Sequence, residues 1–168
     1  MKWVTREHVH VDRTACPWLI KKFIDPRAQF IFAPLEKIPA IVKREKAIPY
    51  DCPDVELGHH GGECSFDAIV KKYDIRDQAV HEMARIIRAA DTDSMDQVPE
   101  AIGLEAVLVG IAHSSKDDKD AVRKARLVYD ALYAHCRLKA IREEHRAELE
   151  KMDKRQTRDF LRKHLAGL

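Results

Sequence analysis

The sequence contains few of the residues that mark unusual protein classes. Among its 168 residues are only six Gly, seven Pro and four Cys, which excludes a collagen-like chain, a low-complexity chain and a dense disulfide scaffold. The longest apolar run, Ala106 to Ala112, is far shorter than the roughly 18 residues that a membrane-spanning helix needs. The N-terminus lacks the apolar core of a signal peptide. We therefore expect one soluble, cytoplasmic domain without membrane contacts.

The cysteines lack the spacing of a zinc finger or a redox motif. Cys16, Cys52, Cys64 and Cys136 are far apart, and no CxxC spacing occurs among them. Because cytoplasmic proteins keep their cysteines reduced, we expect four thiols.

The net charge of +2 is unevenly distributed along the chain. Residues 139–168 contain nine Lys or Arg and six Asp or Glu, whereas the preceding 138 residues contain 21 and 22. In the basic segment the two signs alternate, which is typical of a solvated helix surface rather than of a DNA-binding surface. We therefore expect that this domain alone does not bind DNA.

The first third of the chain has a mixed pattern of strands and helices. Residues 3–12 alternate apolar and polar side chains, which predicts a half-buried strand. From Thr14 to Ile24 the pattern is helical, with Pro17 placed in the first turn. Residues 28–32 are apolar and predict a strand buried on both faces. Weaker signals predict a helix at 35–46 and short strands at 48–51 and 55–57.

The rest of the chain is predicted to be helical. From about residue 64, apolar residues recur at helical spacing, and the nearly all-apolar residues 101–112 predict a helix in the core. The tail from Lys139 has few apolar anchors, so we expect extended helices that pack on the domain, pair with another subunit or fray. The predicted fold is α/β (α+β), with a small N-terminal sheet covered mostly by C-terminal helices. We expect a domain at 2–137 and a basic helical tail at 138–168.

One glycine-rich segment concentrates groups that bind metals. Between Glu56 and Asp67 the chain places His59, His60, Glu63 and Cys64 around three glycines, which let the backbone bend so that side chains converge. Imidazole, carboxylate and thiol suit zinc, and the first two also suit iron or manganese. The start of the following helix would lower the thiol pKa of Cys64 or hold an oxyanion. The alternative is that both histidines hydrogen-bond in a turn and Cys64 packs in the core.

Two further segments contain candidate residues. On the predicted first strand, His8, His10 and Asp12 share one face, which is either a metal site or a solvated surface. Asp12 would orient a neighbouring side chain, and Arg13 would hold an anion, although an ordinary ion pair is equally consistent. Asp91 and Asp93 lie near a helix end whose dipole disfavours carboxylates.

That unfavourable placement leaves two interpretations of the aspartates. Either Asp91 or Asp93 contacts a ligand, a metal ion or an arginine, or Asp93 caps the next helix.

Several of these segments, in this order, resemble one family. They are Val11–Ile20, Glu56–Asp67, Ala90–Asp93 and Tyr129–Tyr133, and together they resemble the C-terminal domain of the chromate-resistance protein ChrB over about residues 2–137. The resemblance implies an association with chromate resistance operons, in which ChrB is a chromate-responsive regulator. Similar domains occur beside rhodanese-like sulfurtransferase domains. The N-terminal half of ChrB has no counterpart here, so a repressor role is not expected if that half recognises DNA.

Three functions remain open at this point. The first is a domain that binds a divalent metal (zinc, iron or manganese) or a tetrahedral oxyanion such as chromate. Its metal ligands would come from His59, His60, Glu63, Cys64, Asp91 and Asp93, with Arg6 and Arg13 as the anion-binding residues. The second is a metal- or thiol-dependent enzyme that uses Cys64. The third is a regulator or interaction module that uses the helical tail, and a homodimer is compatible with each.

Overall fold

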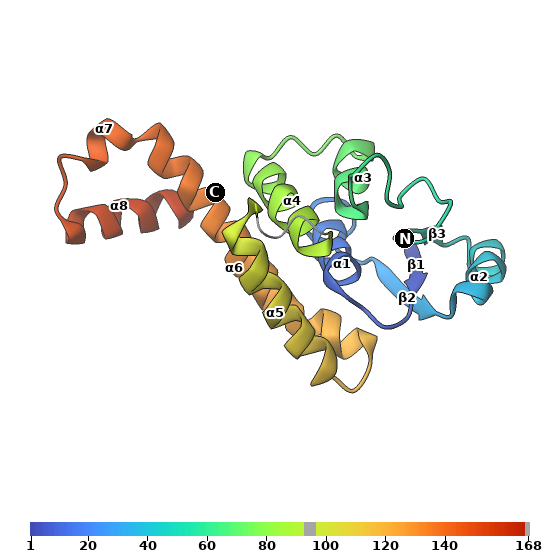
Figure 1. Ribbon diagram of the computed structural model, residues 1–168. Coiled ribbons are helices and arrows are strands. Elements are labelled where there is room, and N and C mark those ends of the chain that lie inside the picture. The colour runs from blue at the N-terminus through green and yellow to red at the C-terminus, as the bar shows by residue number, and fades with distance from the viewer. Residues whose placement is uncertain (93–96, 167–168) are drawn as a thin grey trace.

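The computed structural model describes residues 1–92 and 97–166 (Figure 1). Their elements, in chain order, are β1 (Lys2–Arg6), α1 (Val11–Phe23), β2 (Gln29–Ala33), the 3-10 turn η1 (Leu35–Lys37), α2 (Ile38–Glu45), β3 (Ile48–Pro49), α3 (Ser65–Lys72), α4 (Gln78–Asp91), α5 (Pro99–His113), α6 (Asp118–Glu144), α7 (Arg146–Leu149) and α8 (Lys154–Ala166). The predicted α+β class, with a small N-terminal sheet and mostly helices after it, is confirmed.

The sheet is small and parallel, with strand order β2-β1-β3. In its register Lys2 faces Gln29 and Arg6 faces Ala33, while β3 adds a short pairing beside Trp3 and Val4. Parallel neighbours need crossover connections, and α1 and α2 provide them. Of the two short strands expected after residue 47, the first exists and the second, at 55–57, is absent.

The first strand is shorter than its alternating pattern predicts. It ends at Arg6, because the chain turns at His8, whose φ is 63°, and enters α1 at Val11. The Asp118 carboxylate holds this turn by accepting the backbone N–H groups of His8 and Val9 at 3.1 and 3.0 Å. The expectation that His8, His10 and Asp12 share one strand face is therefore wrong.

Two other local expectations also need correction. Pro17 lies inside α1 rather than in its first turn, because the helix begins before Thr14. Strand β2 is half-buried rather than buried on both faces, since it lies at the edge of the sheet.

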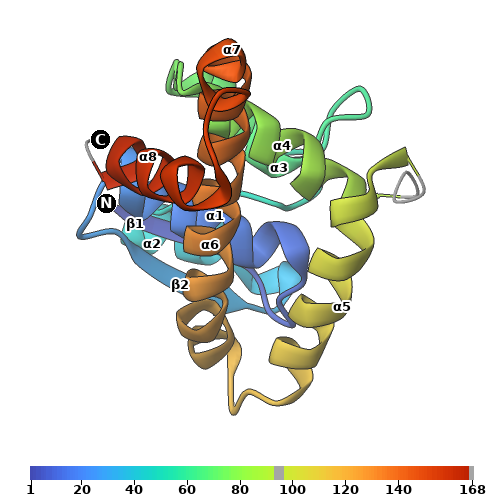
Figure 2. The same cartoon turned by 90° about the vertical axis from the view of Figure 1, so that its left-hand side faces the viewer.

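Helix α1 is the centre of the molecule. It packs against α3, α4 and α6, and Figure 1 shows it between the sheet and α6, with α6 in front of it in Figure 2. Its buried side chains, among them Leu19 and Ile20, join the main apolar core with Trp3, Phe66 and Ile87. Residues up to Ile20 in α1 are consequently mostly buried, whereas Lys21 and Lys22 near its end are exposed.

Helix α5 is less buried than its apolar sequence predicts. It packs beside α6 (Figure 2) and buries Ala101, Leu104 and Leu108, but Ile102 and Val107 are 53% and 48% exposed. The expectation of a core helix is therefore wrong for its outer face.

The C-terminal tail is helical and folds back on itself. Helix α6 continues without a break through residues 137 and 138, and α8 then packs against its last turns, to the left in Figure 1. Ile141 and Leu161 are buried in this contact. Among the described residues, no helix is both long and apolar enough to span a bilayer.

Candidate metal centre

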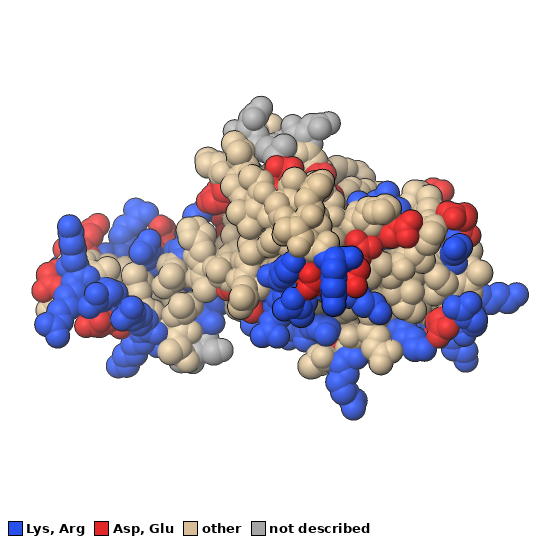
Figure 3. All heavy atoms as spheres, turned by 90° about the horizontal axis from the view of Figure 1, so that it is seen from below, with Lys and Arg blue, Asp and Glu red and all other residues tan. Residues whose placement is uncertain are grey.

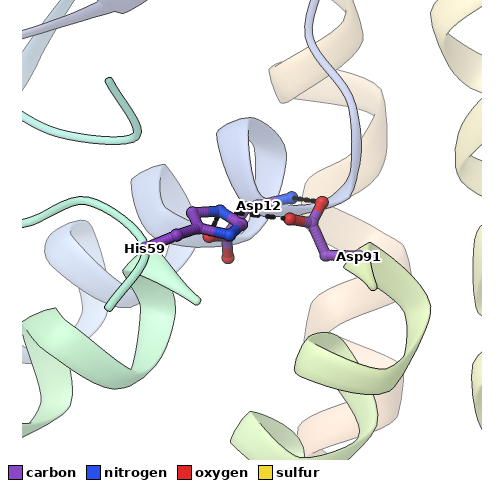
Figure 4. A group of neighbouring side chains, drawn as sticks. All are labelled: Asp12, His59 and Asp91. Atoms are coloured by element: carbon purple, nitrogen blue, oxygen red, sulfur yellow. Dashed lines mark hydrogen bonds and ion pairs between the residues drawn. The ribbon is translucent and has the colours of Figure 1, made fainter. Parts of the chain in front are cut away.

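Three aspartates from separate segments surround the imidazole of a fourth segment. Asp12 comes from the first turn of α1, Asp51 from the loop after β3, His59 from the loop before α3, and Asp91 from the last residue of α4. The His59 Nε2 atom lies 3.4 Å from a carboxylate oxygen of each aspartate. We call these four residues the acidic centre, and Figure 4 shows three of them, with Asp12 and Asp91 pointing toward His59.

Asp12 is held in place by the N-terminus of α3. Its Oδ2 atom accepts the Ser65 backbone N–H at 2.6 Å, and Oδ1 accepts that of Phe66 at 3.3 Å. These are first-turn amides without partners inside their own helix, and the helix dipole favours a negative charge beside them. Burial nevertheless raises the pKa of Asp12, and the negative charge of Asp91 adds to this effect.

Asp91 compensates for its position at a helix C-terminus by capping another helix. Its Oδ1 atom accepts the Asp12 backbone N–H at 3.2 Å and lies 3.5 Å from His10 Nδ1, and its Oδ2 atom faces His59. His10, the N-cap residue of α1, provides no side-chain cap itself, so Asp91 takes this role. The hydrogen bond from His10 to Asp91 raises the pKa of His10.

Asp51 lies on the other side of His59, between two arginines. Its carboxylate is 3.2 Å from an Arg6 guanidinium nitrogen and 2.9 Å from Arg13 Nε. Burial and the charge of Asp12 outweigh these cations, so the pKa of Asp51 rises to about 6. Arg13 also donates to the carbonyls of Glu7 and His8. Both candidate anion-binding arginines thus already contact a carboxylate.

The distances at His59 fit a bound divalent cation. Zinc bonds of about 2.0–2.2 Å to nitrogen and oxygen place ligand atoms roughly 3–3.5 Å apart. Ligand atoms of Asp12, His59 and Asp91 lie within 4.8 Å of one another, and backbone amides orient both carboxylates from behind, as in protein metal sites. The His59 side chain is 43% exposed, so the acidic centre is reachable from solvent.

The electrostatics of the acidic centre favour cations over anions. A long hydrogen bond to Asp12 and the charges of three aspartates raise the pKa of His59. The same concentration of carboxylates attracts a metal ion, whose binding would require the neutral imidazole. A tetrahedral dianion would instead meet like charge.

The predicted ligands divide into two groups in the structure. His59 and Asp91 meet at the acidic centre, together with Asp12, for which the sequence suggests an orienting role or a metal site shared with His8 and His10. His60 is exposed, and its Nε2 atom bonds the Val55 carbonyl at 2.9 Å. Glu63 forms an ion pair with Lys71 at 2.6 Å. Asp93 lies outside the described residues.

Cys64 has the opposite character from the one expected. It is the fully buried N-cap of α3, where its side chain and that of Asp67 form a capping box. Burial, reinforced by the charges of Asp12 and Asp67, raises the pKa of its thiol. The prediction of a lowered pKa at this helix start is therefore wrong, because burial of the thiol and the two neighbouring carboxylates outweigh the helix dipole. All four cysteines are buried and unpaired.

Asp51 is the residue of the acidic centre that the sequence did not reveal. It occupies a turn with φ of 47° between Pro49 and Pro53, and no spacing connects it to His59 or Asp12. Its proximity arises only from the fold, which brings the end of β3 beside α1.

Comparison with known proteins identifies the family. The sequence model of the ChrB C-terminal domain matches residues 3–136. Protein ChrB from Cupriavidus metallidurans is 33% identical over 135 residues, which are 80% of this chain and 40% of that protein. The chain thus spans less than half the length of this relative, and no solved structure matches it. The match over residues 3–136 shows that this chain belongs to the ChrB C-terminal domain family.

Proposed function

We propose that this domain binds a divalent metal ion through Asp12, His59 and Asp91, and that it acts in chromate resistance. The observation that carries the proposal is the 3.4 Å distance from His59 Nε2 to an oxygen of Asp12 and of Asp91. The two carboxylates come from different helices and are oriented by backbone amides, which favours a built site over a chance surface cluster.

The donor set favours zinc, iron(II) or manganese(II). Imidazole and carboxylate suit these ions, whereas a copper(I) site would need soft sulfur ligands. Cys16 and Cys64 are fully buried, and neither belongs to the group of ligand atoms that Asp12, His59 and Asp91 form. Their burial, which raises the pKa of both thiols, argues against a thiol-dependent enzyme.

Family membership supports the link to chromate, and the charge of the acidic centre supports a cation as its ligand. Arg6 and Arg13, the candidate oxyanion ligands, contact Asp51 instead. The amides at the start of α3 are likewise engaged by Asp12. We therefore favour an indirect role for chromate over direct chromate binding at these residues.

Metal analysis of adjacent histidine variants tests the proposal. Protein purified without chelator and then loaded separately with zinc, iron(II) under anaerobic conditions, or manganese is compared with His59→Ala and His60→Ala by mass spectrometry and calorimetric titration. The loss of one ligand is expected to weaken binding at least about tenfold in His59→Ala, whereas His60→Ala behaves as wild type.

Two outcomes would contradict the proposal. One is equal affinity in the two histidine variants, and the other is no binding of any of the three ions by the wild type. Circular dichroism of both variants checks that the fold is retained.

A further inference from the structure

We propose that a groove between β2 and α6 binds an extended, acidic peptide segment of a partner protein, which pairs with the free edge of β2. The groove has a volume of about 820 Å³ and lies open to solvent along the second half of α1. We call it the basic groove. It is lined by Pro17, Trp18, Lys21, Lys22, Pro26, Ala28, Gln29, Phe30, Ile31, Phe32, Lys119, Val122, Arg123, Arg126 and Asp130.

The first support is an unpaired strand edge inside the groove. β2 pairs only with β1 in the described sheet. The Gln29 N–H donates to Met1 and the Glu7 N–H donates to the Ala33 carbonyl, so the odd-numbered residues of β2 direct their backbone groups toward β1. In a parallel ladder the alternate residues, Phe30 and Phe32, then direct their N–H and C=O groups outward. Such an edge is a template for an added strand.

The second support is the charge of the groove. Its lining contains five cationic side chains, Lys21, Lys22, Lys119, Arg123 and Arg126, and one carboxylate, Asp130. Arg123 pairs with Asp120 at 2.6 Å and Arg126 with Asp130 at 3.5 Å, yet the two arginine side chains remain 73% and 72% exposed. Within the described chain the three lysines form no ion pair. Seen from below in Figure 3, Lys and Arg gather in the region of the lower end of α6. An occupant with acidic side chains matches this rim.

The third support concerns the floor of the groove. Phe32 and Val122, both half-buried, provide apolar surface between the cations, and an extended strand alternates its side chains between two faces. A segment that alternates acidic and apolar residues can therefore satisfy both the rim and the floor.

The aromatic residues of the groove argue against single-stranded nucleic acid. Trp18 is only 5% exposed and packs against Phe23 and Tyr133. The Lys21 ammonium lies 5.9 Å from the centre of the Phe30 ring. Base stacking needs open ring faces, and Trp18, the largest ring of the groove, offers none.

This proposal is independent of the metal centre. The basic groove shares no residue with the acidic centre, so either can fail while the other stands.

The test uses a capped peptide of about seven residues with alternating glutamate and valine, a length typical of a short strand. Binding to the whole chain is measured by calorimetry, and the site is mapped from backbone amide shifts in NMR spectra. We expect the largest shifts at Phe30 and Phe32. The variant Arg123→Glu with Arg126→Glu is expected to bind about tenfold more weakly.

Matched controls separate charge from backbone pairing. The exposed pair Arg76→Glu and Arg146→Glu, outside the groove, should leave affinity unchanged. A lysine version of the peptide, and a glutamate version N-methylated at alternate amides, should both bind at least about tenfold more weakly.

Four results would overturn the proposal. They are no binding of the glutamate peptide, equal binding of the N-methylated peptide, shifts that avoid β2, and tighter binding of a single-stranded oligothymidylate than of the glutamate peptide. The last result would assign the groove to nucleic acid instead.

Discussion

The two ends of α1 carry opposite charge. Asp12, at its N-terminus, belongs to the acidic centre, while Lys21 and Lys22, near its C-terminus, line the basic groove. This arrangement follows the helix dipole, which favours anions at the first turn and cations at the last. The net charge of the chain is close to zero, but these two regions carry opposite local charge. Each region therefore favours a different kind of ligand.

The largest expected effect is metal-induced stabilisation. At about 100 times its dissociation constant, a metal that binds only the folded state raises the free energy of unfolding by about 2.7 kcal/mol. We expect this gain in the wild type and in Glu63→Gln, and a much smaller gain in Asp91→Asn, measured by urea denaturation. A full gain in Asp91→Asn would show that Asp91, the contribution of α4, is not a metal ligand.

The next effect separates the structural role of Asp12 from metal binding. Without metal, Asp12→Ala leaves the buried amides of Ser65 and Phe66 without their acceptor, which costs about 2 kcal/mol. Asp12→Asn retains an acceptor oxygen and should lose less. Urea denaturation in the presence of chelator measures both. Equal stability of wild type and Asp12→Ala would mean that the carboxylate is not needed to hold α3.

An ion pair outside both sites gives a reference for ordinary surface charge. Glu82 contacts Arg85 at 2.9 Å and Lys139 at 2.6 Å, which lowers its pKa from the usual 4.5 to about 2. Its stabilising contribution is therefore present above pH 4.5 and is lost as the pH falls toward 2.

Because both cations are partly exposed, we expect Glu82→Gln to cost no more than about 1 kcal/mol at neutral pH. The difference from wild type should shrink between pH 4.5 and pH 2, as followed by thermal unfolding. A constant difference across that range would contradict the assigned charge interaction.

The smallest expected effect concerns the basic groove. Arg123→Glu and Arg126→Glu replace the ion pairs with Asp120 and Asp130 by like charges. Because both arginine side chains are largely exposed, the free energy of unfolding should fall by about 0.5 kcal/mol for each substitution. Metal affinity should also stay the same. A large loss of metal affinity would show that the two ends of α1 are coupled, and the contrast between them would then need revision.

Local patterns predicted the helices better than the turns between elements. The apolar spacing of Phe66, Ile69 and Val70 placed α3 within a residue of its start. The alternation that suggested a long first strand failed at His8, because the turn there depends on Asp118, which is distant in the sequence. The burial of α5 was overestimated for a similar reason, since composition does not tell which face of an apolar helix is covered.

The candidate site was predicted in pieces. The sequence places His59 and Asp91 in one predicted ligand set but assigns Asp12 to a separate segment. The convergence of all three depends on how α1, α3 and α4 pack. No sequence pattern identifies Asp51 as a residue of the site. The prediction for Cys64 fails because the thiol is fully buried and lies beside Asp12 and Asp67, and these effects on its pKa outweigh that of the helix start.

The successive capping of α1 by Asp91 and of α3 by Asp12 has a consequence for local opening of the fold. Asp91 of α4 accepts an amide of α1, and Asp12 of α1 accepts the first amides of α3. An ion bound by both carboxylates would therefore connect the C-terminus of α4 with the N-termini of α1 and α3. Hydrogen exchange at the Asp12, Ser65 and Phe66 amides measures local opening at these helix ends residue by residue. On metal binding, exchange at these amides would slow before any global change in stability became visible.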